Sequence, residues 1–157
     1  MRAKRCRPPI PEVIARVLFL DVDGVLHPGP NVPTRLTHMC WLPELEQVLS
    51  RHPDVAVVVH STWRYRYELA EFRSLLGTSF GARVIDFVPA GERYFGICQW
   101  LAQHRRPGLT YRILDDEAGE FPTPAPAELI VCDTRRGVDD PVVRALLHQW
   151  LGEKSPC

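Results

Sequence analysis

Five short apolar runs, separated by segments with helical spacing, do most to limit the fold of this chain. They cover residues 16–21, 55–59, 83–87, 111–114 and 128–132, and several end at an acidic side chain. Unbroken apolar runs of this length are typical of strands that are buried on both faces of a sheet. Because helices separate the strands, we expect an α/β fold: a three-layer, doubly wound parallel sheet with about five core strands.

Four helices are expected in the remaining segments. The first includes residues 45–49 and closes at His52 and Pro53, the second covers 69–76 and stops at Gly77, and the third covers 93–104. The last begins with Asp140 as N-cap and Pro141 as its first residue. Its expected core face consists of Val142, Val143, Leu146, Leu147 and Trp150. Residues 24–43, rich in Gly, Pro, Asn and Thr, predict a loop or short hairpin.

Length and charge exclude some classes of protein. At 157 residues the chain is expected to be a single domain, with residues 1–12 as a flexible basic arm. Nineteen basic residues balance 19 acidic ones, so no global electrostatic field favours a nucleic-acid or membrane partner. The apolar stretch 13–20 is too short for export or a membrane span, and five cysteines without a CxxC pair favour free thiols. We therefore expect a cytoplasmic protein with no membrane partner.

Polar side chains follow the expected strands at the edge where parallel sheets bind ligands: Asp21, Ser61, Thr62, Asp115, Asp116 and Asp133. Carboxylates that meet at one edge repel one another unless a hard cation neutralises them. Mg²⁺ takes one or two carboxylates together with phosphate oxygens and waters. Two carboxylates near one phosphate can also divide the work of nucleophile and acid/base. The alternative is that Asp21 and Asp23 are ordinary turn acids.

The string FLDVDGVL at residues 19–26 resembles the first signature of the haloacid-dehalogenase-like (HAD) superfamily of phosphatases. The resemblance implies that Asp21 is the nucleophile that becomes phosphorylated and also a Mg²⁺ ligand. It implies that Asp23 is the general acid/base and binds Mg²⁺ through its main-chain carbonyl. Gly24 lets the backbone turn sharply after these acids.

Two further signatures follow in the family's order. The resemblance assigns Ser61 to the transferred phosphoryl group, and Asp115 and Asp116 to Mg²⁺, with Asp116 favoured as the direct ligand. The alternatives are a simple helix cap at Ser61 and a pair of acids on a solvated loop. The string STWR at 61–64 is similar to the HAD domains of nucleic-acid-repair proteins. It places Thr62 and Arg64 beside the substrate, where Arg64 would either fork onto phosphate oxygens or be a surface arginine.

One signature is altered. The family usually has a Lys near the start of the helix before the fourth strand, but the only lysines are Lys4 and Lys154. Arg93 is the expected substitute, with Arg83 as the competitor. A guanidinium is planar and bidentate, so its geometric demands differ from those of an ammonium.

Four other residues have two interpretations each. We count His27 among the substrate-contacting residues, and the alternative is a loop histidine without a role. Asp133 either rims the pocket or orients Arg93, and the alternative is that it only closes a turn. Trp41 and Trp63 either stack on a base or sugar or belong to the core.

These residues predict a Mg²⁺-dependent phosphohydrolase that forms an aspartyl-phosphate on Asp21. Its expected substrate is a phosphomonoester, either a phosphorylated small molecule, a nucleotide or a nucleic-acid end. The segments where the family inserts caps are short: residues 27–44 have room for a hairpin flap and 61–93 for one helix, a strand and loops. We expect no substantial cap domain, and an open site suits bulky substrates.

Two other functions compete with this one. A catalytically degenerate relative would only bind a phosphorylated partner, and the missing Lys favours it. A receiver-like phospho-acceptor domain usually places its phosphorylated acid on a middle strand and a Lys at the last one, and we expect neither here.

Overall fold

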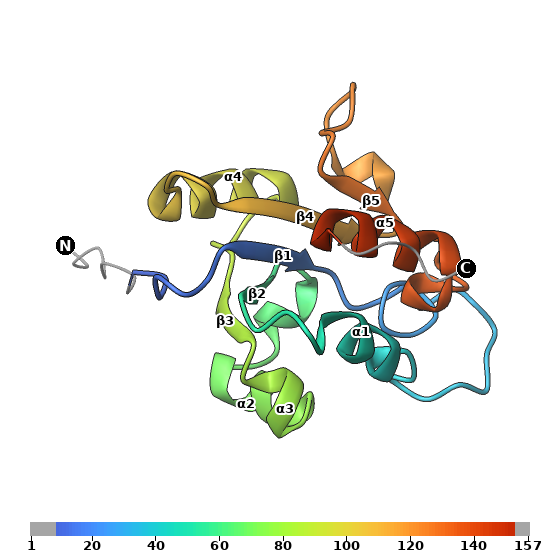
Figure 1. The fold of residues 1–157 in the computed structure, drawn as a ribbon. Coiled ribbons are helices and arrows are strands. Elements are labelled where there is room, and N and C mark those ends of the chain that lie inside the picture. Colours follow the sequence, from blue (N-terminus) through green and yellow to red (C-terminus); the bar gives the residue numbers. More distant parts are fainter. Residues whose placement is uncertain (1–8, 153–157) are drawn as a thin grey trace.

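A single five-stranded sheet organises the computed structural model, which describes residues 9–152 (Figure 1). All strands are parallel, in the order β3-β2-β1-β4-β5. Their bounds are β1 Arg16–Leu20, β2 Val55–Val59, β3 Val84–Phe87, β4 Thr110–Asp115 and β5 Leu129–Val131. The central strand β1 pairs with β2 on one side and β4 on the other, so that Leu20 lies opposite both Val59 and Leu114. All five strands agree with those expected from the sequence.

Helices cover both faces of the sheet, which confirms the three-layer, doubly wound α/β fold. The α-helices are α1 Leu42–Leu49, α2 Leu69–Leu75, α3 Thr78–Gly81, α4 Arg93–His104 and α5 Pro141–Leu151. Three short 3₁₀ helices are η1 Thr62–Tyr65, η2 Ala118–Glu120 and η3 Gly137–Asp139. Helix α4 has the expected bounds, and Asp140 caps α5 by accepting a hydrogen bond from the Val142 N–H. Only α3 has no counterpart among the expected helices.

Two apolar clusters hold the layers together. One face of the sheet presents Phe19 and Ile113 to Ile97 and Trp100 of α4. The other face packs against α1, α2, α3 and α5. In Figure 1, α4 accordingly lies apart from the other four helices. Neighbouring residues of β1 belong to different clusters because side chains alternate between the faces of a strand.

The order in which strands are added to the sheet changes direction at β1: β2 and β3 lie on one side of it, and β4 and β5 lie on the other. The chain builds outward from β1 to β2 and β3 with α1, α2 and α3 on one face, then returns across the other face through α4 to β4. The carboxyl ends of β1 and β4 therefore lie at the topological switch point, where open α/β sheets bind ligands.

The structure corrects part of the expected core face of α5 and decides between the two alternatives for the segment before α1. Helix α5 buries Val143, Leu147 and Leu151, whereas Val142 and Leu146 are 64% and 42% exposed. The buried and the exposed residues both recur at helical spacing, and only the buried ones face the sheet. Residues 28–41 form a loop with turns, which is the first of the two structures expected for this segment, and they contain no hairpin strands.

The expected basic arm over residues 1–12 lies mostly outside the described residues. Its described part is held in place, because the Arg106 guanidinium donates to the carbonyls of Ile10 at 3.1 Å and Pro11 at 2.9 Å. Ile10 itself is buried against the α4 side of the sheet. Residues 9–12 therefore differ from the expected flexible arm.

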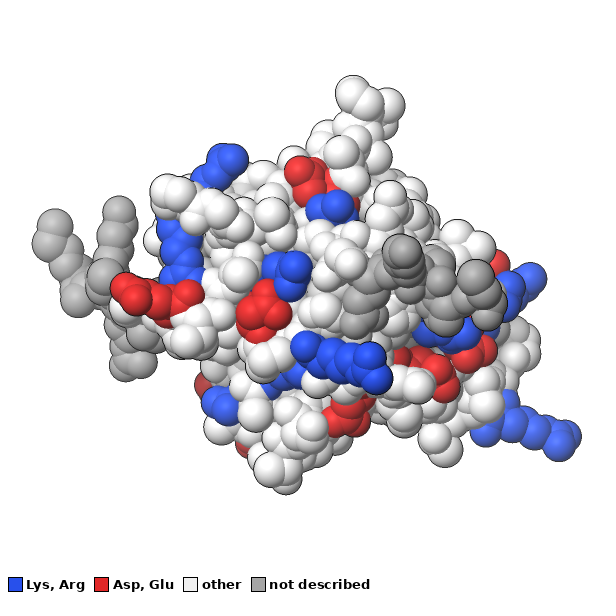
Figure 2. All heavy atoms as spheres, viewed as in Figure 1, with Lys and Arg blue, Asp and Glu red and all other residues white. Residues whose placement is uncertain are grey.

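Charges of both signs are scattered over the face seen in Figure 2, without a large single-sign area there. This agrees with the formal net charge of zero. Within residues 9–152, no helix combines the length and the apolar character needed to span a membrane.

Candidate active site

Three acids from neighbouring strands converge at the switch point. Each of Asp21, Asp115 and Asp116 offers a carboxylate oxygen, and these oxygens lie within 4.8 Å of one another. The sheet dictates this meeting, because β1 and β4 are adjacent and the Asp21 N–H donates to the Leu114 carbonyl at 3.1 Å. The expected convergence of strand-end acids is therefore present for these three residues.

Arg93 links two of the three acids. Its Nη1 donates to Asp21 Oδ2 at 3.0 Å and to both oxygens of Asp115, at 3.0 and 2.9 Å. Its other terminal nitrogen lies 3.4 Å from a carboxylate oxygen of Glu117. Arg93 is the first residue of α4, which begins at the same edge of the sheet. Arg93 thus lies where the family's usual Lys is expected.

The competitor Arg83 lies away from this edge. Its guanidinium donates to the carbonyls of His52 at 2.7 Å, Val55 at 3.2 Å and Leu49 at 2.7 Å. These contacts tie α1 to the beginning of β2, at the opposite end of the strand from Ser61. Arg83 therefore has a structural role.

Burial controls the charge of Asp21. Loss of water raises the pKa of this carboxyl to about 7, and the neighbouring Asp115 adds to the rise. The Arg93 charge, the Val22 N–H and a hydrogen bond from the Ser61 hydroxyl partly offset it. A buried group of like charges held this close is a site where a divalent cation would relieve repulsion.

Asp115 is surrounded by donors. Besides Arg93, its carboxylate accepts hydrogen bonds from the Glu117 N–H and from Nε2 of His60, both at 2.8 Å. Burial alone would raise the pKa of Asp115, but the contact with His60, the hydrogen bond from the Glu117 N–H and the Arg93 charge together outweigh it, and the pKa is lowered. Burial lowers the pKa of His60, so a neutral ring donates to Asp115.

Asp116 keeps more of its acceptor capacity than Asp115. Burial raises the pKa of Asp116, and a hydrogen bond from the Thr134 hydroxyl partly offsets this rise. Its carboxylate fits against Gly24, where the Cβ atom of any other residue would lie 2.0 Å from Asp116 Oδ2. Gly24 thus provides the space in which Asp116 faces Asp21. This arrangement favours Asp116 over Asp115 as the freer metal ligand.

Asp23 is directed elsewhere by its side chain. Its carboxylate accepts a hydrogen bond from His27 Nε2 at 2.8 Å and another from the Trp63 indole N–H at 3.0 Å. The hydrogen bond from His27 is the main reason why the pKa of Asp23 is lowered. The Asp23 carboxylate is therefore outside the three-acid group, and a metal contact would fall to its main-chain carbonyl.

His27 is buried, and its ring contacts Asp23. Only 3% of the residue is exposed. Its Nδ1 accepts a hydrogen bond from the Met39 N–H at 3.2 Å, which leaves the ring proton on Nε2, facing Asp23. Met39 has a φ of 61°, unusual for a side chain of this kind, and this backbone conformation brings its N–H to His27. His27 therefore orients Asp23.

The residues after β2 divide into three cases. Ser61 is buried, interacts with Asp21 through its hydroxyl, and also accepts a hydrogen bond from the Trp63 N–H at 3.4 Å, so it caps η1 as well. Thr62 is exposed at the same edge. The Arg64 guanidinium binds main-chain carbonyls of His60, Ser61 and Gly91. Its expected fork onto phosphate is thus replaced by contacts within the protein.

Asp133, Trp41 and Trp63 each had two interpretations, and in each case the structure agrees with the one that gives the residue a structural role. The Asp133 carboxylate accepts a hydrogen bond from the Arg135 N–H at 2.8 Å and closes a turn. Trp41 and Trp63 are buried in the core. Trp63 nevertheless contributes to the site, because its indole N–H orients Asp23.

Four contributors escaped the sequence analysis: His60, Glu117, Thr134 and the indole of Trp63. His60 and Glu117 directly adjoin signature residues, which is the one signal that could have suggested them. Thr134 and Trp63 act through contacts across the fold, and no local pattern indicates such contacts.

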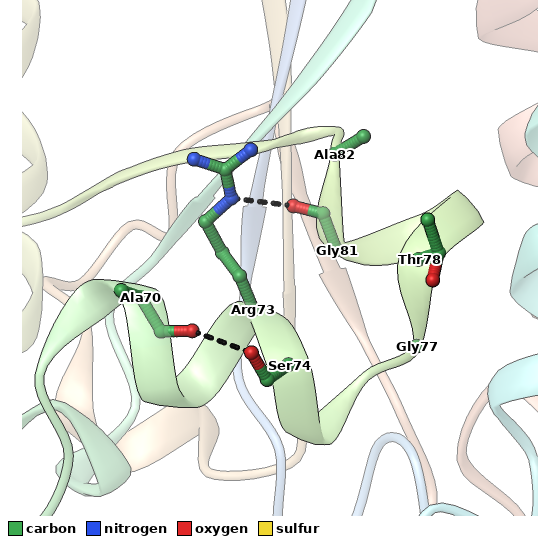
Figure 3. A pocket seen from close by; sticks show the side chains of 7 residues that line it. All are labelled: Ala70, Arg73, Ser74, Gly77, Thr78, Gly81 and Ala82. Atoms are coloured by element: carbon green, nitrogen blue, oxygen red, sulfur yellow. Dashed lines mark hydrogen bonds between the residues drawn. The ribbon is translucent and has the colours of Figure 1, made fainter.

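A separate pocket of about 480 Å³ lies between α2 and α3 (Figure 3). Its lining contains no acid, and two of its polar side chains make hydrogen bonds with main-chain carbonyls. Arg73 Nε donates to the Gly81 carbonyl at 3.0 Å, and the Ser74 hydroxyl donates to the Ala70 carbonyl at 3.1 Å. This pocket lies between two packed helices and has none of the carboxylates that form the three-acid group.

The comparisons with known proteins agree with this geometry. A family model described as the HAD domain in Swiss Army Knife RNA repair proteins matches residues 17–143, which is most of the chain and includes every site residue above. No curated protein and no solved structure matches the chain. Asp21 directly follows the central strand β1, contrary to the expectation that no acid lies at a middle strand, so strand position alone does not exclude a receiver-like domain. The family match excludes it.

Proposed function

The chain belongs to the family of HAD domains in Swiss Army Knife RNA repair proteins, and we propose that it is a Mg²⁺-dependent phosphohydrolase acting through an aspartyl-phosphate. One observation carries the proposal: the buried Asp21 carboxylate lies between Arg93 at 3.0 Å and two further acids. A nucleophile, a cation and a metal-ligand set are the parts that this chemistry requires.

The donor set suits a hard divalent cation. Asp21 and Asp116, with the main-chain carbonyl of Asp23, would hold Mg²⁺, which prefers such oxygen ligands. When bound, Mg²⁺ would neutralise charge on the carboxylates and on the phosphoryl oxygens. Asp115 would support the group from behind, since its oxygens already accept from Arg93, His60 and Glu117.

The reaction then has two steps. Asp21 attacks phosphorus in line, the bond to the leaving oxygen breaks, and Asp23 gives that oxygen a proton. Asp23 must be protonated for this step, against the hydrogen bond from His27 that lowers its pKa. Asp23 next takes a proton from a water molecule, which attacks the phosphorus and releases Asp21 and inorganic phosphate. Ser61 and Arg93 hold the phosphoryl oxygens in both steps, so the protein mainly positions the group and balances its charge.

A nucleotide or nucleic-acid end is the substrate that we propose. The matched family is named for RNA repair proteins, and residues 9–152 contain no large cap over the strand ends. An uncovered site admits a terminal phosphate on a long polymer. The formal net charge of zero suits recognition of an end better than binding along a nucleic-acid tract.

The proposal is tested by hydrolysis of p-nitrophenyl phosphate with Mg²⁺ and with excess EDTA. A panel of nucleotides, phosphorylated metabolites and oligonucleotides with a 3′- or 5′-phosphate then identifies the substrate class. We expect turnover that EDTA abolishes and Mg²⁺ restores, fastest on a nucleic-acid end. Binding of phosphate and Mg²⁺ without turnover of any substrate would instead identify a phosphate-binding module.

Asp116→Asn is expected to weaken Mg²⁺ binding roughly tenfold or more, because it replaces the freer carboxylate ligand by a neutral amide. Isothermal titration calorimetry measures the affinity. Asp133→Asn is the matched control: it removes an exposed acid at the end of the neighbouring strand β5, which closes only a turn. Equal affinities for the two variants would show that Asp116 is not a ligand.

Mg²⁺ affinity is expected to rise between pH 6 and pH 8 in the absence of substrate. The pKa of Asp21 is raised to about 7, chiefly by burial, so a proton competes with the metal below that pH. The competition costs at most about tenfold in affinity per pH unit below 7. Calorimetric titrations at several pH values measure it, and an affinity that does not change with pH would contradict it.

A further inference from the structure

We propose that Arg64, Tyr65 and Gly91 form a latch that fixes the position of Arg93 relative to Ser61. Arg64 and Tyr65 are then positioning residues of the proposed phosphohydrolase site, on which this inference rests. The latch joins two segments that are distant in the chain and that carry the two groups expected to hold the phosphoryl oxygens.

Arg64 bridges the two segments directly. Its Nη1 donates to the carbonyls of His60 and Ser61, the latter at 2.9 Å. Its Nη2 donates to the Gly91 carbonyl and to the Tyr65 hydroxyl, both at 2.8 Å. One planar guanidinium therefore holds the end of β2 on one side and the loop before α4 on the other. A lysine ammonium lacks this forked geometry.

Tyr65 completes the contact from the same 3₁₀ helix. Its hydroxyl accepts a hydrogen bond from the Gly91 N–H at 2.9 Å and donates to the Gly91 carbonyl at 3.3 Å. The Arg64 guanidinium also lies 4.4 Å from the centre of the Tyr65 ring. Both polar backbone groups of Gly91 are thereby bonded to the latch.

Little else restrains the segment that the latch holds. Residues 90–92 are exposed, and nothing lies within 4 Å of the position that a Cβ atom would take at Gly91. Glu92, the N-cap of α4, makes no side-chain capping hydrogen bond. Arg93 follows directly, so the latch anchors the backbone two residues before the group that contacts Asp21 and Asp115. Loosening it would let the Arg93 guanidinium drift from those acids.

The position of Arg64 in the latch also has an unfavourable feature. Among the described residues its Nε is buried without a hydrogen-bond partner. An unpaired buried donor costs free energy, and such a group in a native structure calls for an explanation. The four contacts made by its terminal nitrogens provide one.

The test uses Arg64→Lys and Tyr65→Phe, which keep size and most packing but remove the fork or the hydroxyl. We expect kcat for p-nitrophenyl phosphate to fall about tenfold with KM changed less than about threefold, because misplacing a charge-stabilising group mainly affects the transition state. Arg83→Lys is the matched control. It removes an equivalent set of arginine–carbonyl contacts at the other end of β2 and should lower the melting temperature while leaving kcat unchanged.

A double-mutant cycle shows whether the latch acts through Arg93. In an Arg93→Ala background, Tyr65→Phe should cause no further loss of kcat and no further weakening of inorganic phosphate binding. Losses that simply add would overturn the latch, as would unchanged kcat in Arg64→Lys and Tyr65→Phe. Phosphate binding by calorimetry keeps the two proposals apart. If the wild-type protein binds phosphate but turns nothing over, the proposed function fails, while the effect of the latch variants on binding still decides the inference.

Discussion

Replacing Asp21 by Asn is expected to reduce phosphomonoester turnover by at least about a thousandfold, because an amide oxygen cannot form the phosphorylated intermediate. The fold should survive the change. Asn has the shape of Asp, and its neutral side chain removes the repulsion with Asp115 that burial makes costly. Steady-state kinetics and a thermal melt of the same preparation measure the two effects.

Asp133→Asn again provides the control, since this exposed acid also follows a strand of the sheet. It should keep wild-type turnover. A direct search for the intermediate adds a second readout: denatured wild-type protein quenched during turnover should carry a phosphoryl group that Asp21→Asn lacks. Full activity of Asp21→Asn would exclude the mechanism proposed here.

Gly24→Ala is expected to have the second-largest effect. A methyl group at this position would lie 2.0 Å from Asp116 Oδ2, and the backbone φ of 75° disfavours any side chain. Either Asp116 moves away from Asp21 or the loop after β1 shifts. Both changes should lower turnover about a hundredfold, because displacement of a catalytic group by an ångström is costly.

Gly77→Ala separates the collision from the backbone strain. Gly77 has a similar φ of 82°, but nothing lies within 4 Å of its Cβ position. This variant should lose about 1–3 kcal/mol of stability, because only glycine readily adopts the backbone conformation found there, with φ 82° and ψ 165°, and it should keep its turnover. Urea denaturation and kinetics of both variants provide the comparison. A Gly24→Ala protein that behaved like Gly77→Ala would show that the fit of Asp116 against Gly24 is unimportant.

The sequence was sufficient to predict the fold because local patterns of apolar residues indicate its strands and its longer helices. Apolar runs predicted all five strands, and their parallel pairing brought Asp21 next to Asp115 without further information. The outward faces of α5 could not be predicted in the same way. Val142 and Val143 have equal helical spacing to their partners, and only contact with the sheet decides which of them is buried.

The errors at the site have a common cause. His27 and Arg64 were expected to face a substrate, yet both are engaged by groups far away in the chain, such as the Met39 N–H and the Gly91 carbonyl. A motif records which side chains are present but not which main-chain groups lie opposite them. Arg93 could be recognised because it occupies the first position of a predictable helix, at a known edge of the sheet.

The strand that carries Asp21 is hydrogen-bonded on both flanks and occupies the middle of the sheet. Fraying at β3 or β5 can therefore disturb the outer loops while the reactive carboxylate keeps its scaffold. Amide hydrogens of β1 should exchange with solvent only when the whole molecule opens. The scaffold of the proposed nucleophile is thus as stable as the fold itself, and the loops at the edges of the sheet are the parts that can adapt to a substrate.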